Sequence, residues 1–152
     1  RGTYLVSKAV ATHMVNRGGG GKIINIASGA GKRGIARYAA YCASKFAVIG
    51  FTQAMAQEMA VNRINVNAIC PGMLWTPMWH QIARLRSRVD ASPEFKGLSG
   101  REYFDKTIDS IIPLKREQTP EDIGNLVAFL ASEYACNITG QSINVSGGLM
   151  MN

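Results

Sequence analysis

The stretch Lys22-Ile23-Ile24-Asn25-Ile26-Ala27 decides the fold of this chain. It is rich in β-branched residues and too short for a typical buried helix, so it predicts a buried strand. A second run of this kind at residues 64–69 follows a helical pattern at residues 38–60. Strands that alternate with helices pair in parallel, because each helix returns the chain across the sheet. The sequence therefore predicts an α/β protein.

The rest of the chain extends the alternation. Apolar residues at helical spacing predict a helix at residues 3–16. Thr119-Pro120-Glu121-Asp122 predicts the start of a helix that runs to about Ala131, because it offers a cap, a first-turn proline and acids at the positive end of the dipole. A last strand is expected at 141–145, whereas residues 71–113 are expected to be irregular or short-helical. We expect one domain over residues 1–152.

Composition excludes several functional classes. No run of about 18 uncharged apolar residues predicts a membrane span. The net charge is +7, but the basic residues are scattered, with a modest concentration from Arg84 to Arg101, so we expect no nucleic-acid partner. Cys42, Cys70 and Cys136 have no metal-ligand spacing, so we expect no metal site and a cytoplasmic protein with buried, reduced cysteines.

Tyr41 and Lys45 lie four residues apart in a predicted helix and therefore one turn apart on the same face. A phenol in water has a pKa of about 10, too high for ready proton exchange at neutral pH. A cation about 4 Å away, at an effective dielectric near 20, contributes roughly 4 kcal/mol, or about 3 pKa units. Such a pair can shuttle protons. By itself, Tyr-x-x-x-Lys also fits an ordinary exposed helix face.

The context of this pair is more specific. Ser28 ends the first predicted strand, and Asn65-Val66-Asn67-Ala68-Ile69-Cys70-Pro71-Gly72 combines the second strand with a Pro-Gly turn. With Tyr41 and Lys45 between them, these motifs resemble the classical short-chain dehydrogenase/reductase family from Gly2 to about Gly148. The resemblance implies the C-terminal part of a Rossmann-type, doubly wound parallel sheet.

The resemblance also implies roles for the catalytic residues. Ser28 would hydrogen-bond the substrate oxygen and stabilise developing charge. Tyr41 would exchange the proton. Lys45 would lower the pKa of the phenol and hold the nicotinamide ribose hydroxyls, so Tyr41 and Lys45 belong to the cofactor site as well.

The turn Pro71-Gly72-Met73-Leu74-Trp75-Thr76 resembles the family turn that contacts the nicotinamide carboxamide. Pro71 and Gly72 would form it, Leu74 would act through its backbone and Thr76 through its hydroxyl. An ordinary strand-exit turn is the alternative. The family places its substrate loop next, here at about residues 73–113. Its aromatic and methionine residues fit either a core or a substrate pocket: Trp75, Met78, Trp79, Phe95, Tyr103 and Phe104.

Gly29-Ala30-Gly31-Lys32-Arg33-Gly34 matches G-x-G-x-x-G directly after a predicted strand. A dinucleotide fingerprint also needs a helix that starts at the glycines and an acid about twenty residues later. The next acid, Glu58, lies late in the predicted helix. We therefore interpret this loop as part of the active site, beside Ser28.

The resemblance implies an NAD(P)-dependent oxidoreductase that interconverts a secondary alcohol and a ketone. The choice between NAD and NADP stays open, because the selecting residues precede the matching region in the family. The tail at residues 137–152 is similar to polyol and diol dehydrogenases, with 3-ketoacyl reductase as the alternative. A homo-oligomer, dimer or tetramer, would pair the helix at 38–60 across Ala40, Ala43, Ala47 and Gly50.

The family's glycine-rich nucleotide loop and Asn-Ala-Gly element also precede the matching region. We therefore expect a C-terminal part that alone binds no dinucleotide and is inactive. Its strand at residues 22–27 would lie at an open sheet edge with an apolar flank. A non-catalytic family member, or a fragment that serves only in assembly, is the rival interpretation.

Overall fold

The central strand of the fold is β2 (Ile64–Pro71), which pairs in parallel with β1 (Gly21–Ile26) on one side and β3 (Ser142–Val145) on the other. The computed structural model describes residues 1–152. Val66, Ala68, Ile69 and Cys70 of β2 are fully buried. A parallel strand covered on both faces needs such an almost continuous apolar run.

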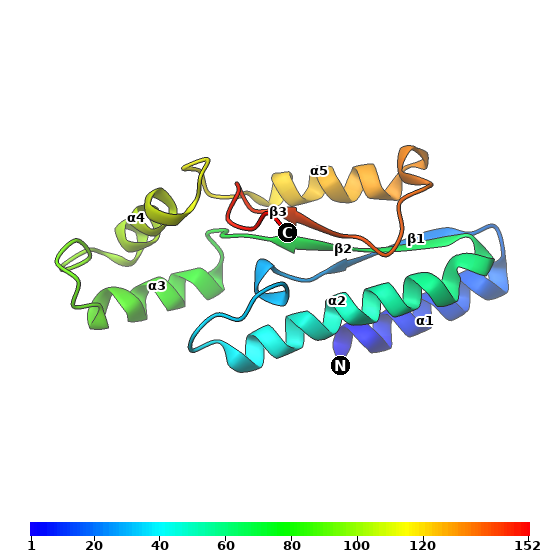
Figure 1. Cartoon of the computed structure of the whole chain (residues 1–152), viewed down its shortest axis with the longest axis horizontal. Helices are drawn as coiled ribbons and strands as arrows, with labels where there is room; N and C mark the ends of the chain where they lie inside the picture. Colours follow the sequence, from blue (N-terminus) through cyan, green and yellow to red (C-terminus); the bar gives the residue numbers. More distant parts are fainter.

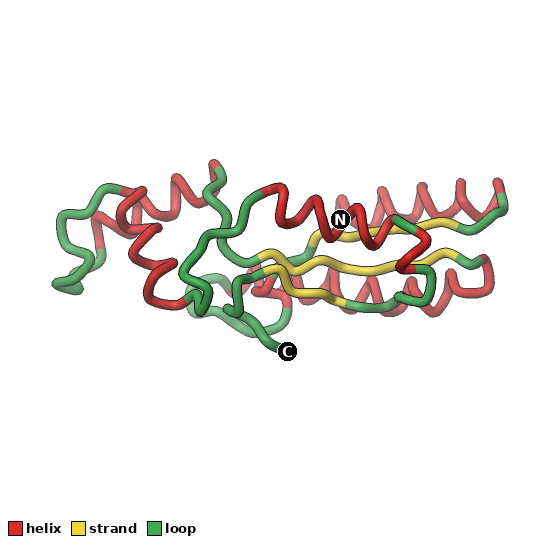
Figure 2. Tube along the Cα trace, turned by 90° about the horizontal axis from the view of Figure 1, so that it is seen from above, coloured by secondary structure: helices red, strands yellow, loops and turns green.

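Helices cover both faces of the sheet (Figures 1 and 2). Helices α1 (Gly2–Arg17) and α2 (Ala39–Met59) lie on one face, and α5 (Pro120–Ala131) lies on the other. The first interface buries Ala11, Ile23, Met55, Ala56, Ile64 and Val66; the second buries Ile69, Leu130 and Ala135. The α/β class and these six predicted elements are confirmed. No helix combines the length and apolar character that a membrane crossing requires.

One edge of the sheet is formed by β1, which pairs only with β2. Ile26 at its end is 45% exposed. Helix α1, next to this edge, exposes Tyr4, Leu5 and Val6 by 50–64%. The open edge and its apolar flank agree with the sequence prediction.

Residues 71–113 are more regular than predicted, because they contain α3 (Pro77–Val89) and α4 (Gly100–Ile111). Both helices begin at a side-chain cap, and Ser99 and Glu102 form a complete capping box at α4. This S-x-x-E pattern was the missed sequence signal. The two helices pack on each other around a core of their own: Met73, Ala83, Tyr103, Phe104, Ile108 and Ile112.

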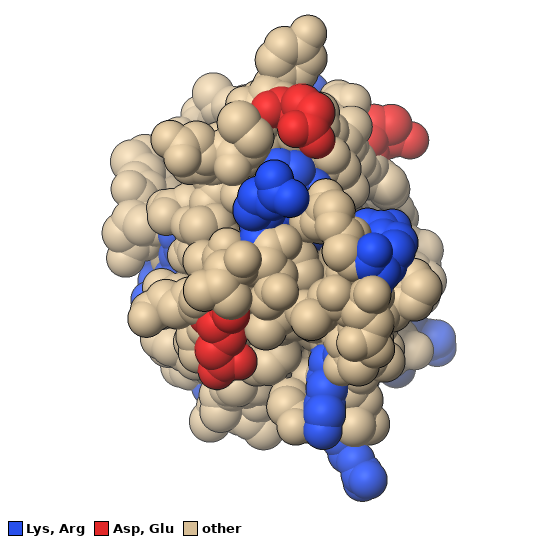
Figure 3. All heavy atoms as spheres, turned by 90° about the vertical axis from the view of Figure 1, so that its right-hand side faces the viewer, with Lys and Arg blue, Asp and Glu red and all other residues tan.

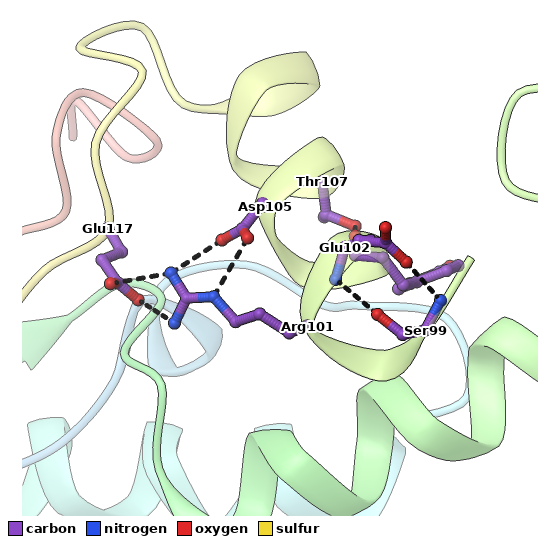
Figure 4. A network of polar contacts seen from close by, with 7 residues as sticks. Ser99, Arg101, Glu102, Asp105, Thr107 and Glu117 are labelled. Atoms are coloured by element: carbon purple, nitrogen blue, oxygen red, sulfur yellow. Dashed lines mark hydrogen bonds and ion pairs between the residues drawn. The ribbon is translucent and has the colours of Figure 1, made fainter.

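A surface network joins α4 to the segment before α5 (Figure 4). Arg101 contacts both carboxylate oxygens of Asp105, at 2.8 and 3.0 Å, and Glu117 at 3.0 Å. Its guanidinium also lies 5.0 Å from the centre of the Trp75 ring. Exposed ion pairs stabilise weakly one by one, but here three contacts orient one side chain.

The charges are dispersed, as the scattered sequence positions suggest. Figure 3 shows the end of the molecule opposite the α3–α4 pair, where basic and acidic side chains are separated by uncharged surface. The cysteine prediction is correct for Cys42 and Cys70, which are buried, and wrong for Cys136, which is exposed. Cys136 follows the short 3-10 turn Glu133–Ala135, outside the core.

Candidate active site

A cavity of about 350 Å³ opens where β1 and β2 end. Ligands of open parallel sheets bind at these carboxyl ends. Four residues predicted from the sequence line this cavity: Ser28, Tyr41, Pro71 and Gly72. The structure therefore brings together side chains that are separated by up to 44 positions in the sequence.

Ser28 follows β1 in an extended conformation, with φ of −175°. Its Oγ accepts a hydrogen bond from the Ala30 backbone N–H at 3.2 Å, which starts the 3-10 turn Gly29–Gly31. The hydroxyl hydrogen has no partner within the chain and remains available to a ligand. Because the serine oxygen is anchored to its own turn, its position is defined before substrate binds.

Gly31 lets this turn lie directly against α2. A Cβ atom at Gly31 would lie 2.7 Å from the backbone oxygen of Lys45. No other residue type fits without moving the turn or the helix. The main-chain contact fixes Ser28 relative to the helix that carries Tyr41 and Lys45.

Tyr41 lies in the first turn of α2 and lines the cavity, with Lys45 one turn further on. The Lys45 Nζ is 5.7 Å from the centre of the Tyr41 ring and donates to the Ile26 backbone oxygen at 3.2 Å. Lys45 itself does not line the cavity. Burial lowers the pKa of Lys45, and the Cys70 side chain opposes this shift. The ammonium is thus tethered behind the phenol.

The Pro71-Gly72 turn is held by Gln118, which the sequence reasoning missed. The buried Gln118 side-chain oxygen accepts a hydrogen bond from the Met73 backbone N–H at 2.7 Å. The backbone N–H of Gln118 donates to the Met73 backbone oxygen at 3.0 Å. A Cβ at Gly72 would collide with the same Gln118 oxygen. Gln118 carries no motif; it only precedes the Thr119 cap.

Leu74 and Thr76 lie beyond this turn and do not line the cavity. The Thr76 Oγ caps α3 by accepting from the Trp79 N–H at 3.5 Å. Its hydroxyl hydrogen is not used by this cap. A contact of Leu74 or Thr76 with a cofactor stays a prediction.

Some of the aromatic and methionine residues of this segment lie in the cavity, and others lie in a hydrophobic core. Met78 and Trp79 on α3 line the cavity. Tyr103 and Phe104 on α4 are buried between the two helices. Trp75 packs against this core, with its ring centre 5.0 Å from that of Phe104.

The glycine loop after β1 contains a 3-10 turn, and the next α-helix begins only at Ala39. The helix that a dinucleotide fingerprint requires at the glycines is therefore absent. Gly29 and Ala30 line the cavity beside Ser28, as interpreted from the sequence. No cluster of three or more His, Cys, Asp or Glu side chains has the arrangement of a metal site.

Comparison with known proteins gives a consistent family. Residues 1–150 match the family model described as enoyl-(acyl carrier protein) reductase. A short-chain dehydrogenase/reductase of Armillaria gallica is 41% identical over 99% of this chain and 53% of its own length. The (3R)-3-hydroxyacyl-CoA dehydrogenase of Rattus norvegicus is 41% identical over 99% of this chain and 51% of its own length.

The fold comparison agrees. The structure of an actinorhodin polyketide ketoreductase with NADPH superposes with a TM-score of 0.78, at 39% identity, over 90% of this chain and 49% of that one. The chain thus spans about half the length of the relatives it matches. Within that span, fold, motif order and sequence agree: the chain belongs to the short-chain dehydrogenase/reductase family.

Proposed function

We propose that the protein is an NAD(P)-dependent oxidoreductase that interconverts a secondary alcohol and a ketone. The observation that best supports this proposal is that Ser28 and Tyr41 line one cavity, with Lys45 one helical turn after Tyr41. Named relatives include a dehydrogenase and a ketoreductase, the latter solved with NADPH.

The donors near the cavity suit a nicotinamide nucleotide. Lys45 would hold the ribose hydroxyls through an ammonium that already contacts the end of β1. Pro71 and Gly72 would supply backbone contacts, and Leu74 and Thr76 would bind the carboxamide. When bound, the cofactor supplies or accepts the hydride.

The protein's own residues would manage the proton. The Ser28 hydroxyl would donate to the carbonyl oxygen and orient it. Tyr41 would give its proton to that oxygen during reduction and take it back during oxidation. The Lys45 ammonium would stabilise the phenolate that forms between these events.

The lining of the cavity favours a ketone with an apolar chain, such as a 3-ketoacyl substrate, over a polyol or diol. Buried hydroxyls without partners are unfavourable. Most lining side chains away from Ser28 and Tyr41 are apolar: Ile35, Met73, Met78, Trp79, Ile82, Ile111, Leu149 and Met150. The name of the rat relative, a hydroxyacyl-CoA dehydrogenase, supports this preference.

Tyr41→Phe in the full-length protein tests the proposal, because it removes only the proton donor. We expect kcat to fall about 10²–10⁴-fold while cofactor affinity is retained. The control is Tyr134→Phe, the same chemical change at a side chain that is 90% exposed and lies outside the cavity. Near-normal turnover by Tyr41→Phe would end the proton-transfer assignment.

We also propose a cytoplasmic homo-oligomer, dimer or tetramer, that pairs α2 with its mate. Ala40, Ala43, Ala47 and Gly50 form an exposed strip that permits close helix approach. Ala47→Arg should shift sedimentation of the full-length protein toward monomers. Gln81→Arg, the introduction of the same side chain at an exposed position of α3, is the control. A wild-type monomer at micromolar concentration would contradict the proposal.

A further inference from the structure

Two arginines line the cavity of Ser28 and Tyr41, and no carboxylate does. Arg33 comes from the loop after the 3-10 turn, and Arg86 comes from α3. Their charges have no role in the proton transfer proposed above. An apolar cavity with only cationic charge in its lining attracts anions, because field lines concentrate between low-dielectric walls.

Neither guanidinium is neutralised by an ion pair. The ion pairs of the chain join Arg101 to Asp105 and Glu117, and Arg116 to Asp122. The Arg86 guanidinium instead lies 5.4 Å from the centre of the Tyr38 ring.

The carboxylate of Asp90 and the hydroxyl of Tyr103 also lie near Arg86, but Arg86 and Asp90 form no ion pair. One Asp90 oxygen accepts from the Ser92 N–H at 3.0 Å and the other from the Tyr103 hydroxyl at 2.9 Å. A guanidinium carries five N–H donors, so Arg86 keeps donors for a ligand beside its contact with Tyr103, and Arg33 keeps its own.

Helix α3 places charge and apolar surface in a definite order. Its cavity face consists of Met78, Trp79, Ile82 and Arg86. At a rise of 1.5 Å per residue, Arg86 lies about 10 Å along the axis from Trp79. The apolar positions are nearer the Pro71-Gly72 turn, and the cation lies farther from it.

We propose that the cavity binds a ketone whose apolar chain ends in an anionic group, a carboxylate or a phosphate ester, held by Arg33 and Arg86. This rests on the proposed oxidoreductase function and specifies its substrate class. Guanidinium groups bind carboxylate and phosphate through paired hydrogen bonds. The chain between ketone and anion would fill the apolar stretch formed by Trp79 and Ile82.

The test compares ketones that differ only in charge, with the full-length protein and its cofactor. The probes are 7-oxooctanoate, its methyl ester, 7-oxooctyl phosphate and 7-oxooctanol, in which an apolar chain separates the ketone from the terminal group. We expect kcat/KM for each anion to exceed that of its neutral partner by about tenfold or more, since charge-assisted hydrogen bonds are the strong ones. The ratio between the two anions shows whether carboxylate or phosphate is preferred.

Arg33→Gln with Arg86→Gln should bring the anion-to-neutral ratio of kcat/KM close to one, because the variant removes the two cations that distinguish anionic from neutral ketones. Arg88→Gln, an exposed arginine of α3 outside the cavity, should keep the wild-type ratio. Equal kcat/KM for anionic and neutral ketones in the wild type would overturn this inference and leave the oxidoreductase function standing.

A binding measurement separates the two proposals if no ketone is turned over. Trp79 lines the cavity, so octanoate binding can be followed by tryptophan fluorescence. Octanoate binding that is lost in the double variant and kept in Arg88→Gln would support the anion site even if the redox function fails. Binding that is unaffected by the double variant, or absent from the wild type, would overturn it.

Discussion

The sheet with α2 and the α3–α4 pair differ in what holds them together. In the sheet region, buried polar groups cross three elements: Ser7 donates to Asn25 at 3.1 Å, and Asn25 donates to Thr52 at 3.0 Å. The α3–α4 pair has its own apolar core, and it meets the rest of the chain through Leu149, which packs against that core, the Arg101–Glu117 ion pair and the contact of Arg86 with the Tyr38 ring. Figure 1 shows the pair beyond the end of the sheet.

The two regions carry different parts of the proposed site: the residues for proton transfer and the surface for substrate recognition. Ser28, Tyr41 and Lys45 are carried by β1 and α2, where satisfied buried hydrogen bonds specify one arrangement. The surface that would recognise the substrate, including Trp79 and Arg86, is carried by the less constrained pair. Regions with fewer contacts to the main core open at lower free energy. The proposed proton chemistry would thus lie on the more constrained part and the proposed substrate specificity on the less constrained part.

The largest effects should come from core truncations in the two regions. Ile69 and Phe104 are both fully buried, one in β2 and one in α4. We expect Ile69→Ala to lower the free energy of unfolding by about 2–5 kcal/mol and Phe104→Ala by about 3–5 kcal/mol.

The two truncations should differ in which functional property they leave unchanged. Ile69→Ala should weaken cofactor affinity and turnover together, whereas Phe104→Ala should raise KM and keep cofactor affinity. Denaturant melts, amide hydrogen exchange and steady-state kinetics measure this. Equal exchange protection of α4 and β2 in the wild type would contradict the comparison.

A smaller effect is expected from Lys45, which belongs to the rigid part. Lys45→Ala should move the rise of the oxidation rate to higher pH and weaken cofactor binding, because one ammonium serves both phenol and ribose. Burial lowers the pKa of Lys45, so the wild type loses this charge as pH rises through that lowered pKa.

Lys45→Arg provides the matched control. Its guanidinium stays charged at every accessible pH, so any decline that follows from deprotonation of Lys45 should disappear. Superimposable pH–rate profiles for wild type and Lys45→Ala would show that the ammonium does not assist Tyr41.

The smallest of these effects concerns Gln118, which holds the turn that joins the two regions. Gln118→Ala leaves the buried Met73 N–H without its partner, at a cost of about 1–3 kcal/mol. Cofactor affinity should fall and substrate KM should rise, because the turn leads into both the proposed cofactor site and the proposed substrate site. Gln118→Glu keeps an acceptor for Met73 but loses the donor to the Arg116 backbone oxygen and buries a charge, so it should restore only part of the loss. An alanine variant with unchanged KM and cofactor affinity would limit Gln118 to folding.

Elements that depend on interactions between residues close in sequence were predictable, whereas those that depend on packing between distant segments were not. Strands β1 and β2 and the start of α5 were predictable, because β-branched runs and caps act locally. In residues 71–113 the local capping box of α4 was overlooked, and the shared core of α3 and α4 was not predictable because it depends on the two helices packing together.

The candidate site divides in the same way. Ser28, Tyr41 and the Pro71-Gly72 turn were found through motifs, and the structure places them around one cavity. Gln118 was missed because its bond to Met73 spans 45 positions and leaves no periodic trace in the sequence. The Thr76 cap was also missed, because a hydroxyl that caps a helix and one that binds a ligand look alike in sequence.

The close approach of Gly31 to α2 has a consequence for how the site responds to heat and to mutation. The spacing between α2 and the turn that follows Ser28 is set by contact between two main chains, which have no rotamers to change, and not by a flexible side chain. Thermal motion or substitutions in the α3–α4 pair would therefore change which molecules fit the cavity before they disturb the alignment of Ser28 with Tyr41. If the proposed function holds, the helical pair could then accommodate new substrates while Ser28 and Tyr41 keep their positions.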